Sequence, residues 1–188
     1  SGEGTTSQGD FHEALNWASR EKAPVIFHVE NNGYAISVPI KEQTAGESIY
    51  KISSGYENLA RISVDGTNYF ESLLAFKQSV DRARKGLGPT LIESHVPRLL
   101  PHSSSDDHRK YRTEDDLQND IKKDPIDLFK NECIKEKIFS EKDFIKIEKE
   151  ILKEIDTDVD WAEMQDNPKS KDAMKYIYSN ATCDNFVD

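Results

Sequence analysis

The sequence is short of cysteine and of positive charge, and it contains no long hydrophobic run. Its two cysteines, Cys133 and Cys183, lie far apart and form no Cys-x-x-Cys motif, which fits a reducing compartment. A formal net charge of −10 disfavours nucleic-acid binding, because neutralising phosphates requires clustered Lys and Arg. No apolar stretch approaches the roughly 18 residues of a transmembrane helix, and no secretion signal is recognisable. We therefore expect neither nucleic-acid nor membrane partners.

The 188 residues are 36% hydrophobic and 32% charged, enough apolar content for one domain with a core. Up to about residue 96, the pattern alternates between helical and strand periodicity. It predicts helices over 7–23, 46–54 and 68–85, and strands over 25–29, 60–64 and 90–96. In the third helix, Leu73, Phe76, Val80 and Ala83 form the predicted apolar stripe. This rhythm predicts an α/β fold, a parallel sheet with flanking helices.

The character changes after the third strand. Residues 97–112, PRLLPHSSSDDHRKYR, have no periodicity and predict a long loop, which in a compact domain is usually functional or disordered. Residues 113–178 predict a charged helical region, and 179–188 a tail or linker. Within 113–178, helix starts are predicted at Thr113, at Asp124-Pro125 and at Ser140 with Asp143. The last of these helices carries an apolar face of Phe144, Ile147, Ile151 and Ile155. Residues 176–178 predict a short extended segment.

Two polar stretches carry the chemistry. Gly2 and Gly4 allow a sharp turn and a close ligand approach, Glu3 supplies a hard oxygen, and a helix N-terminus follows, which suits phosphate. Asn32 and Tyr34 follow the first strand, where amide and carbonyl oxygens are ligands that Mg²⁺ accepts. One helix and one strand separate Glu3 from Asn32, so both should reach the carboxyl edge of a parallel sheet. Each stretch alone is usually only a turn; together they predict one Mg²⁺-diphosphate site.

The stretches GEGTTSQGDFHEALNWA and PVIFHVENNGYAIS resemble the thiamine diphosphate motif, Gly-Asp/Glu-Gly followed by Asn-Asn. More closely, the chain resembles the α subunit of the E1 component of branched-chain 2-oxo acid dehydrogenase (2-oxoisovalerate dehydrogenase). Pyruvate dehydrogenase E1 α is a near relative. The likeness runs through the loop 97–112 and less sharply to about Tyr178. Residues 1–112 would thus form the C-terminal part of the cofactor-binding α/β domain, and 113–178 a helical extension.

The resemblance implies roles for particular residues. Side chains of Glu3 and Asn32 and the carbonyl of Tyr34 would bind Mg²⁺. The diphosphate would be lined by Gly2, Gly4 and Thr5. His102 would be the catalytic residue, on a loop that closes over the cofactor and is organised by Arg98, Tyr111 and Arg112. Ser103 matches a serine that a kinase phosphorylates in mitochondrial relatives, where the added charge of about −2 would be disruptive. Glu30 stands where an arginine is expected in animal relatives, so no diphosphate contact is expected there.

The resemblance also implies an activity and partners. Thiamine diphosphate would carry the oxidative decarboxylation of a branched-chain 2-oxo acid, and the acyl group would pass to a lipoyl-bearing E2. The glutamate that activates the cofactor would come from an E1 β subunit or a fused β-like domain. Because an upstream strand is expected before Gly2, we expect residues 2–6 to be poorly anchored and the chain to be inactive alone. A bacterial cytoplasm is favoured over a mitochondrial matrix.

Other functions remain open from the sequence. Within the same superfamily, the chain could serve a pyruvate or an acetoin dehydrogenase. A different class would be a non-catalytic phosphate-binding module, which should have lost Glu3, Asn32 or His102, and none is lost. A pure assembly module would be favoured if the acidic helical region were the only ordered part.

Overall fold

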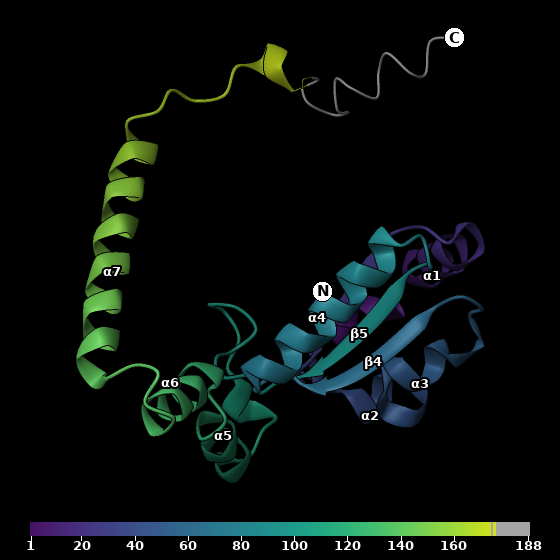
Figure 1. The fold of residues 1–188 in the computed structure, drawn as a ribbon, viewed down its shortest axis with the longest axis horizontal. Coiled ribbons are helices and arrows are strands. Elements are labelled where there is room, and N and C mark those ends of the chain that lie inside the picture. The colour runs from purple at the N-terminus through teal and green to yellow at the C-terminus, as the bar shows by residue number, and fades with distance from the viewer. Residues whose placement is uncertain (174, 176–188) are drawn as a thin grey trace. The chain divides into compact units, whose positions relative to one another are not determined.

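The computed structural model describes residues 1–173 and 175 (Figure 1). The chain divides into two compact units, Ser1–Ile138 and Phe139–Asp188. Among the described residues, no helix combines the length and the apolar character needed to cross a membrane. The predicted segments 176–178 and 179–188 lie outside the described residues.

A three-stranded parallel sheet forms the centre of the first unit. It consists of β1 (Ile26–Asn31), β5 (Thr90–His95) and β4 (Ala60–Asp65), with β5 in the middle. The register pairs Val29 of β1 and Ser63 of β4 with Glu93 of β5. All three predicted strands are therefore confirmed, and so is the α/β class. Parallel strands joined by helical crossovers bring their carboxyl ends to one edge of the sheet.

One face of the sheet is covered by α1 (Gly9–Glu21) and α3 (Ile49–Ile52). The core on this face is a cluster of completely or almost completely buried residues: Leu15, Val29, Ile49, Leu59 and Leu91. Between β1 and α3, the chain forms a hairpin of two short strands, two residues each, and a short helix. The sequence pattern did not predict either of them. These are β2 (Tyr34–Ala35), β3 (Val38–Pro39) and α2 (Ile40–Gln43).

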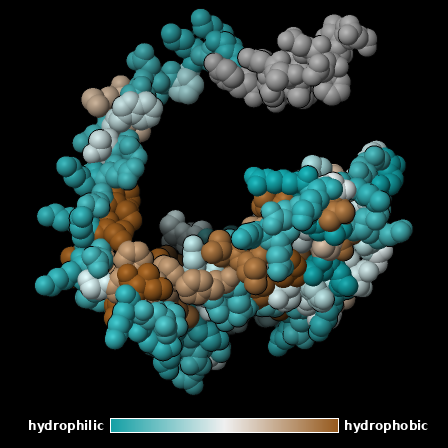
Figure 2. Space-filling model, viewed as in Figure 1, coloured by the Kyte–Doolittle hydropathy of each residue, from teal (hydrophilic) through white to brown (hydrophobic). Residues whose placement is uncertain are grey.

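Helix α4 (Tyr69–Arg84) packs against all three strands, and Figure 1 shows it beside β5. The side chain of Asn68 caps it by accepting from the amides of Phe70 and Glu71. The predicted apolar stripe is wrong in part, because Leu73 is 51% exposed while Ala75 and Ser79 are the buried residues. Small side chains let α4 approach the sheet closely, so larger apolar groups turn outward, and Figure 2 shows hydrophobic side chains gathered over α4.

In the described part of the predicted helical region, three helices form with the predicted starts. In the first unit, Thr113 and Asp116 form a capping box at α5 (Glu114–Ile121), and Asp124 caps α6 (Pro125–Lys135). In the second unit, Ser140 and Asp143 form a capping box at α7 (Glu141–Glu163). These reciprocal side-chain bonds satisfy amides that the first turn of a helix leaves unpaired. Short 3-10 turns complete the described chain at Glu3–Ser7, Ala45–Glu47, Ser53–Gly55, His108–Lys110 and Ser170–Asp172.

Candidate functional site

The chain opens with a well-held turn beside β1. Residues Glu3–Ser7 form a 3-10 turn, and α1 begins at Gly9 rather than at Ser7. Gly2 pairs with Glu30 in a parallel bridge, and the Glu30 amide donates to the Ser1 carbonyl over 2.8 Å. The expectation that residues 2–6 are poorly anchored is therefore wrong, because Gly2 pairs with the free edge of β1 and hydrogen bonds within the turn hold Thr5 and Thr6.

Hydrogen bonds from two side chains hold the Glu3 carbonyl. The Thr6 hydroxyl donates to it over 2.6 Å and the Gln43 amide over 3.0 Å. The Gln43 amide also donates to the Ser7 hydroxyl, so α2 ties down both ends of the turn. Nothing in the sequence pattern pointed to Gln43, because α2 itself was not predicted.

Glu3 and Asn32 lie side by side, as their spacing predicts. The Asn32 amide donates to Glu3 Oε2 over 3.2 Å. The Glu3 side chain is completely buried, yet its other oxygen, Oε1, has no hydrogen-bond partner. Burial raises the pKa of Glu3 above its ordinary value, and the amide bonds around it only partly offset this effect. A buried carboxylate with an unused oxygen is a group that a cation would satisfy.

The turn after β1 presents the other expected ligands. Gly33 has a φ of +83°, and its amide donates to the Asn31 side-chain oxygen over 3.1 Å. The Tyr34 amide donates to the Asn32 side-chain oxygen, also over 3.1 Å. A carbonyl-type oxygen has two lone pairs, so Asn32 Oδ1 can still take a cation while it holds Tyr34.

A groove of about 450 Å³ lies over these residues. All seven residues that were expected to contact cofactor or metal line it: Gly2, Glu3, Gly4, Thr5, Asn32, Tyr34 and His102. A Cβ added to Gly4 would come within 2.9 Å of the Ala35 Cβ, whereas one added to Gly2 would meet no atom within 4 Å. The glycine at position 4 is thus required for packing the turn on β2, and the one at position 2 leaves space in the groove.

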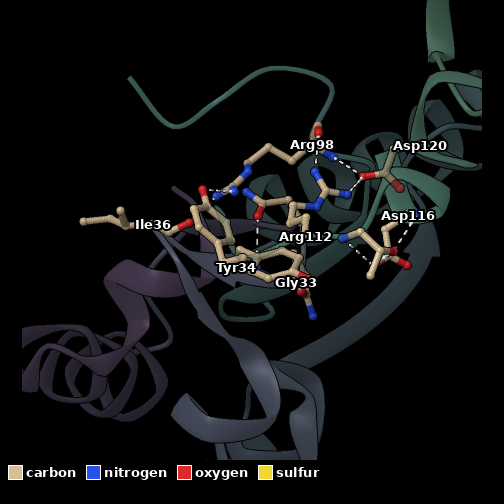
Figure 3. Close-up of polar contacts among 11 residues, drawn as sticks. Gly33, Tyr34, Ile36, Arg98, Arg112, Asp116 and Asp120 are labelled. Atoms are coloured by element: carbon tan, nitrogen blue, oxygen red, sulfur yellow. Dashed lines mark hydrogen bonds and ion pairs between the residues drawn. The ribbon is translucent and has the colours of Figure 1, made fainter. Parts of the chain in front are cut away.

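Two arginines of the loop 97–112, Arg98 and Arg112, lie beside the turn that follows β1 (Figure 3). Arg98 donates to the Ile36 carbonyl and, over 2.6 Å, to the Tyr111 hydroxyl. That hydroxyl donates over 2.6 Å to Asp106, which also accepts the His102 amide over 2.9 Å. Arg98 therefore links the β2 hairpin to the segment that carries His102. The imidazole is exposed at the rim of the groove.

Arg112 anchors the end of the loop. It is 8% exposed, donates over 2.9 Å to the Arg98 carbonyl and forms an ion pair with Asp120 of α5. Its guanidinium lies 5.2 Å from the centroid of the Tyr34 ring, and that of Arg98 lies 5.1 Å from the same ring. Both arginines thus stack on the residue whose carbonyl is an expected ligand. The sequence pattern did not point to Asp120, which is one of several acidic residues on α5.

Two further expected positions lie apart from this network. Ser103 is exposed, and its hydroxyl is 3.2 Å from that of Ser105. The Glu30 side chain is exposed, and its residue interacts with the N-terminal turn through the backbone. Within the described part of the chain, no three His, Cys, Asp or Glu side chains gather to hold a metal. A cation here would depend on one carboxylate, an amide oxygen, a backbone carbonyl and oxygens of its ligand.

Comparison with known proteins gives consistent matches. Residues 1–171 match the family described as "Dehydrogenase E1 component". The chain is 38% identical over 178 residues to the 2-oxoisovalerate dehydrogenase subunit alpha of Bacillus subtilis, covering 95% of this chain and 54% of that protein. It is 40% identical over 155 residues to the pyruvate dehydrogenase E1 component subunit alpha of Acholeplasma laidlawii, covering 82% and 45%.

A third relative is the 3-methyl-2-oxobutanoate dehydrogenase subunit alpha of Mycobacterium tuberculosis, 41% identical over 129 residues, or 69% of this chain and 35% of that protein. The chain therefore spans about half the length, or less, of these curated relatives.

Proposed function

Because the chain belongs to the dehydrogenase E1 component family, we propose that it binds the diphosphate end of thiamine diphosphate through Mg²⁺. It would do so as the α part of a branched-chain 2-oxo acid dehydrogenase. The observation that carries this proposal is the buried Glu3 carboxylate with its unpartnered oxygen in a groove beside Asn32.

The residues around the groove suit a hard cation and a diphosphate. Glu3 and Asn32 would bind Mg²⁺ through side-chain oxygens and Tyr34 through its carbonyl, all oxygen ligands of the kind Mg²⁺ prefers. Gly2 leaves open space for the ligand. The Thr5 amide already donates to the Gly2 carbonyl over 3.2 Å, so the Thr5 hydroxyl is the donor that remains for a phosphate oxygen.

His102 would act from the loop. Its backbone is held by Asp106 while its imidazole reaches the rim of the groove, so the ring can donate to a phosphate oxygen or to the reacting centre. Arg98 and Arg112 touch the Tyr34 ring and the loop at once, and would orient rather than react. Ser103 is exposed next to His102, so a phosphoryl group there would bring negative charge to the diphosphate.

Catalysis needs groups beyond this chain. When bound, thiamine diphosphate supplies the nucleophilic carbon and the electron sink that decarboxylation of a 2-oxo acid requires. The resemblance to E1 α subunits implies that the carboxylate that activates the cofactor comes from an E1 β subunit or a fused β-like domain. A lipoyl-bearing E2 would take the acyl group.

The substrate class has one close alternative. The relatives include proteins named for 2-oxoisovalerate or 3-methyl-2-oxobutanoate and proteins named for pyruvate. We favour the branched-chain acid, on the residues Ala35-Ile36-Ser37 and the His102-Ser103-x-x-Asp106-Asp107 pattern. Competition between 3-methyl-2-oxobutanoate, pyruvate and acetoin at equal concentration, in the complete complex, decides between them by the ratio of kcat/KM.

Calorimetry with Mg²⁺ and thiamine diphosphate tests the cofactor site in the complete α chain assembled with its β partner. We expect cofactor binding that requires Mg²⁺ and is lost in Glu3→Ala. The matched control is Glu13→Ala, which removes an exposed carboxylate from α1 and should leave binding unchanged. Binding that survives Glu3→Ala, or that needs no divalent cation, would contradict the proposal.

A further inference from the structure

A second completely buried carboxylate, Glu93, lies in the middle of the central strand β5. Its neighbours in the sheet are Val29 and Ser63, and it is the acidic residue of a strand that reads TLIESH. We infer that Glu93 is the positioning residue of the cation site: it fixes the amide orientation of Asn31 and thereby the turn that presents Asn32 and Tyr34. This inference rests on the proposed cofactor site and names a residue outside the set expected to touch it.

Glu93 is fully occupied by donors within the fold. Oε1 accepts from the Asn31 side chain over 2.8 Å and the Ile49 amide over 3.0 Å. Oε2 accepts from the Ser48 hydroxyl over 2.7 Å and the Tyr50 amide over 3.0 Å. Burial alone would raise the pKa of Glu93, but these bonds hold it below its ordinary value. An ionised carboxylate with four donors needs no further ligand.

The link to the site passes through Asn31. An ionised carboxylate only accepts hydrogen bonds, so Asn31 must present its amino group to Glu93. Its carbonyl oxygen then faces the other way and accepts the Gly33 amide over 3.1 Å. Rotating the Asn31 amide by half a turn would place its oxygen against the Glu93 carboxylate. It would also place its NH2 group against the Gly33 amide N–H, so both hydrogen bonds would be lost. The charge on Glu93 therefore selects one of two side-chain orientations of nearly identical shape.

The turn is consequently held by carboxylates on two sides. The Asn32 amide is bound by Glu3 over 3.2 Å, and the neighbouring Asn31 side chain is bound by Glu93. Glu3 keeps an unpartnered oxygen, whereas both oxygens of Glu93 are satisfied. This difference separates their roles, because only Glu3 has a lone pair to offer a cation. Glu93 acts on the ligand set through Asn31.

Glu93 also holds α3, which provides an internal control. Ser48 donates to Oε2 and caps α3 by accepting the Lys51 amide over 3.2 Å. Ser48→Ala therefore weakens the α3 side of the Glu93 network and leaves Asn31 untouched. A purely structural role for Glu93 predicts that Ser48 and Asn31 variants behave alike, whereas a positioning role predicts that only the Asn31 side changes cation affinity.

The test uses Glu93→Gln in the complete α chain with its β partner. In Glu93→Gln, Mg²⁺-dependent affinity for thiamine diphosphate should fall about 10- to 100-fold, as for other outer-shell partners of metal ligands. In the cofactor-free protein, amide hydrogen exchange should speed up in the peptide that contains Gly33 and Tyr34. Ser48→Ala should lower the melting temperature yet leave both the Mg²⁺ dependence and that exchange rate unchanged.

A second variant at Asn31 sharpens the test. Asn31→Asp sets a carboxylate against Glu93 Oε1 in place of the amino group that donates to it, so the affinity should fall here as well. Where Glu93→Gln does not yield folded protein, Asn31→Ala serves instead, since Glu93 then keeps three donors. Wild-type cofactor affinity and unchanged exchange in these variants would overturn the inference. Absence of cofactor binding in the wild type would instead overturn the proposed function, and the exchange measurement would still decide the role of Glu93.

Discussion

At the scale of single residues, the site is defined by how one carboxylate is buried. The folded state raises the pKa of Glu3 because burial disfavours its charge and Oε1 lacks a partner. A raised pKa means that the folded protein binds a proton more tightly than the unfolded chain does. The ionised carboxylate therefore destabilises the fold as pH rises from the ordinary value of 4.5 through the raised one, and this cost persists at neutral pH.

We expect Glu3→Gln to stabilise the cofactor-free protein at pH 7. The gain should be on the order of 1 kcal/mol in the free energy of unfolding, because the variant removes a buried charge but keeps the acceptor for Asn32. The stability gain should shrink at pH values below the ordinary pKa of Glu3, where wild-type Glu3 is protonated in both the folded protein and the unfolded chain. Urea titrations at neutral and acidic pH measure both values. A loss of stability at pH 7 would contradict this account of Glu3, and the same variant should no longer gain stability from Mg²⁺ with cofactor.

At the scale of elements, α5 and the loop 97–112 are joined by one ion pair. The Arg112 side chain is 3% exposed and that of Asp120 is 19% exposed. Asp120 also accepts the Arg98 amide over 3.2 Å, so it closes the loop at both ends. Removing one member of a buried pair leaves the other charged and unpaired, which is far more costly than losing an exposed pair.

Asp120→Ala should therefore lower the free energy of unfolding by about 3 kcal/mol. The matched control is Asp107→Ala in the same loop region, whose partner Arg109 has a side chain that is 74% exposed. That variant should cost at most about 1 kcal/mol, as exposed pairs do. Chemical denaturation of both variants gives the comparison. Similar losses in the two would show that the Arg112 pair is not what holds the loop.

At the scale of the whole molecule, the described groove residues all lie within Ser1–Ile138. This compact unit includes α5 and α6 as well as the sheet. That residues 113–178 form a helical extension of the same subunit stays a prediction. The position of Asp120 nevertheless ties the beginning of that region to the loop.

Two truncations of this chain test the division. A chain that ends after Ile138 should unfold cooperatively with an unchanged midpoint for the first unit, because it keeps the sheet, the loop and Asp120. A chain that ends after Arg112 loses Asp120 and should unfold at a clearly lower temperature. Thermal denaturation followed by circular dichroism measures both midpoints. Equal midpoints for the two truncations would contradict the dependence of the loop on α5.

Features that depend on local pattern could be predicted from the amino acids alone. Apolar runs and helical spacing predicted three parallel strands and the helices between them, and capping residues at 113, 124 and 140 predicted three helix starts. The spacing of Glu3 and Asn32 predicted their meeting, because a strand–helix–strand unit brings its carboxyl ends to one edge. These inferences need only neighbours in the chain.

Contacts between distant segments determine which face of α4 is buried, how the N-terminal turn is held and what surrounds each carboxylate, so these features could not be predicted. Leu73 points outward because the small side chains Ala75 and Ser79 of α4 are the ones buried. The N-terminal turn is held at Gly2 by a bridge to β1. Positions 3 and 93 are both glutamate, yet Glu3 keeps an unpartnered oxygen whereas Glu93 accepts from four donors. The four donors to Glu93 come from residues 43 to 62 positions away in the sequence. Local sequence patterns cannot predict such contacts, because they form only when the chain folds.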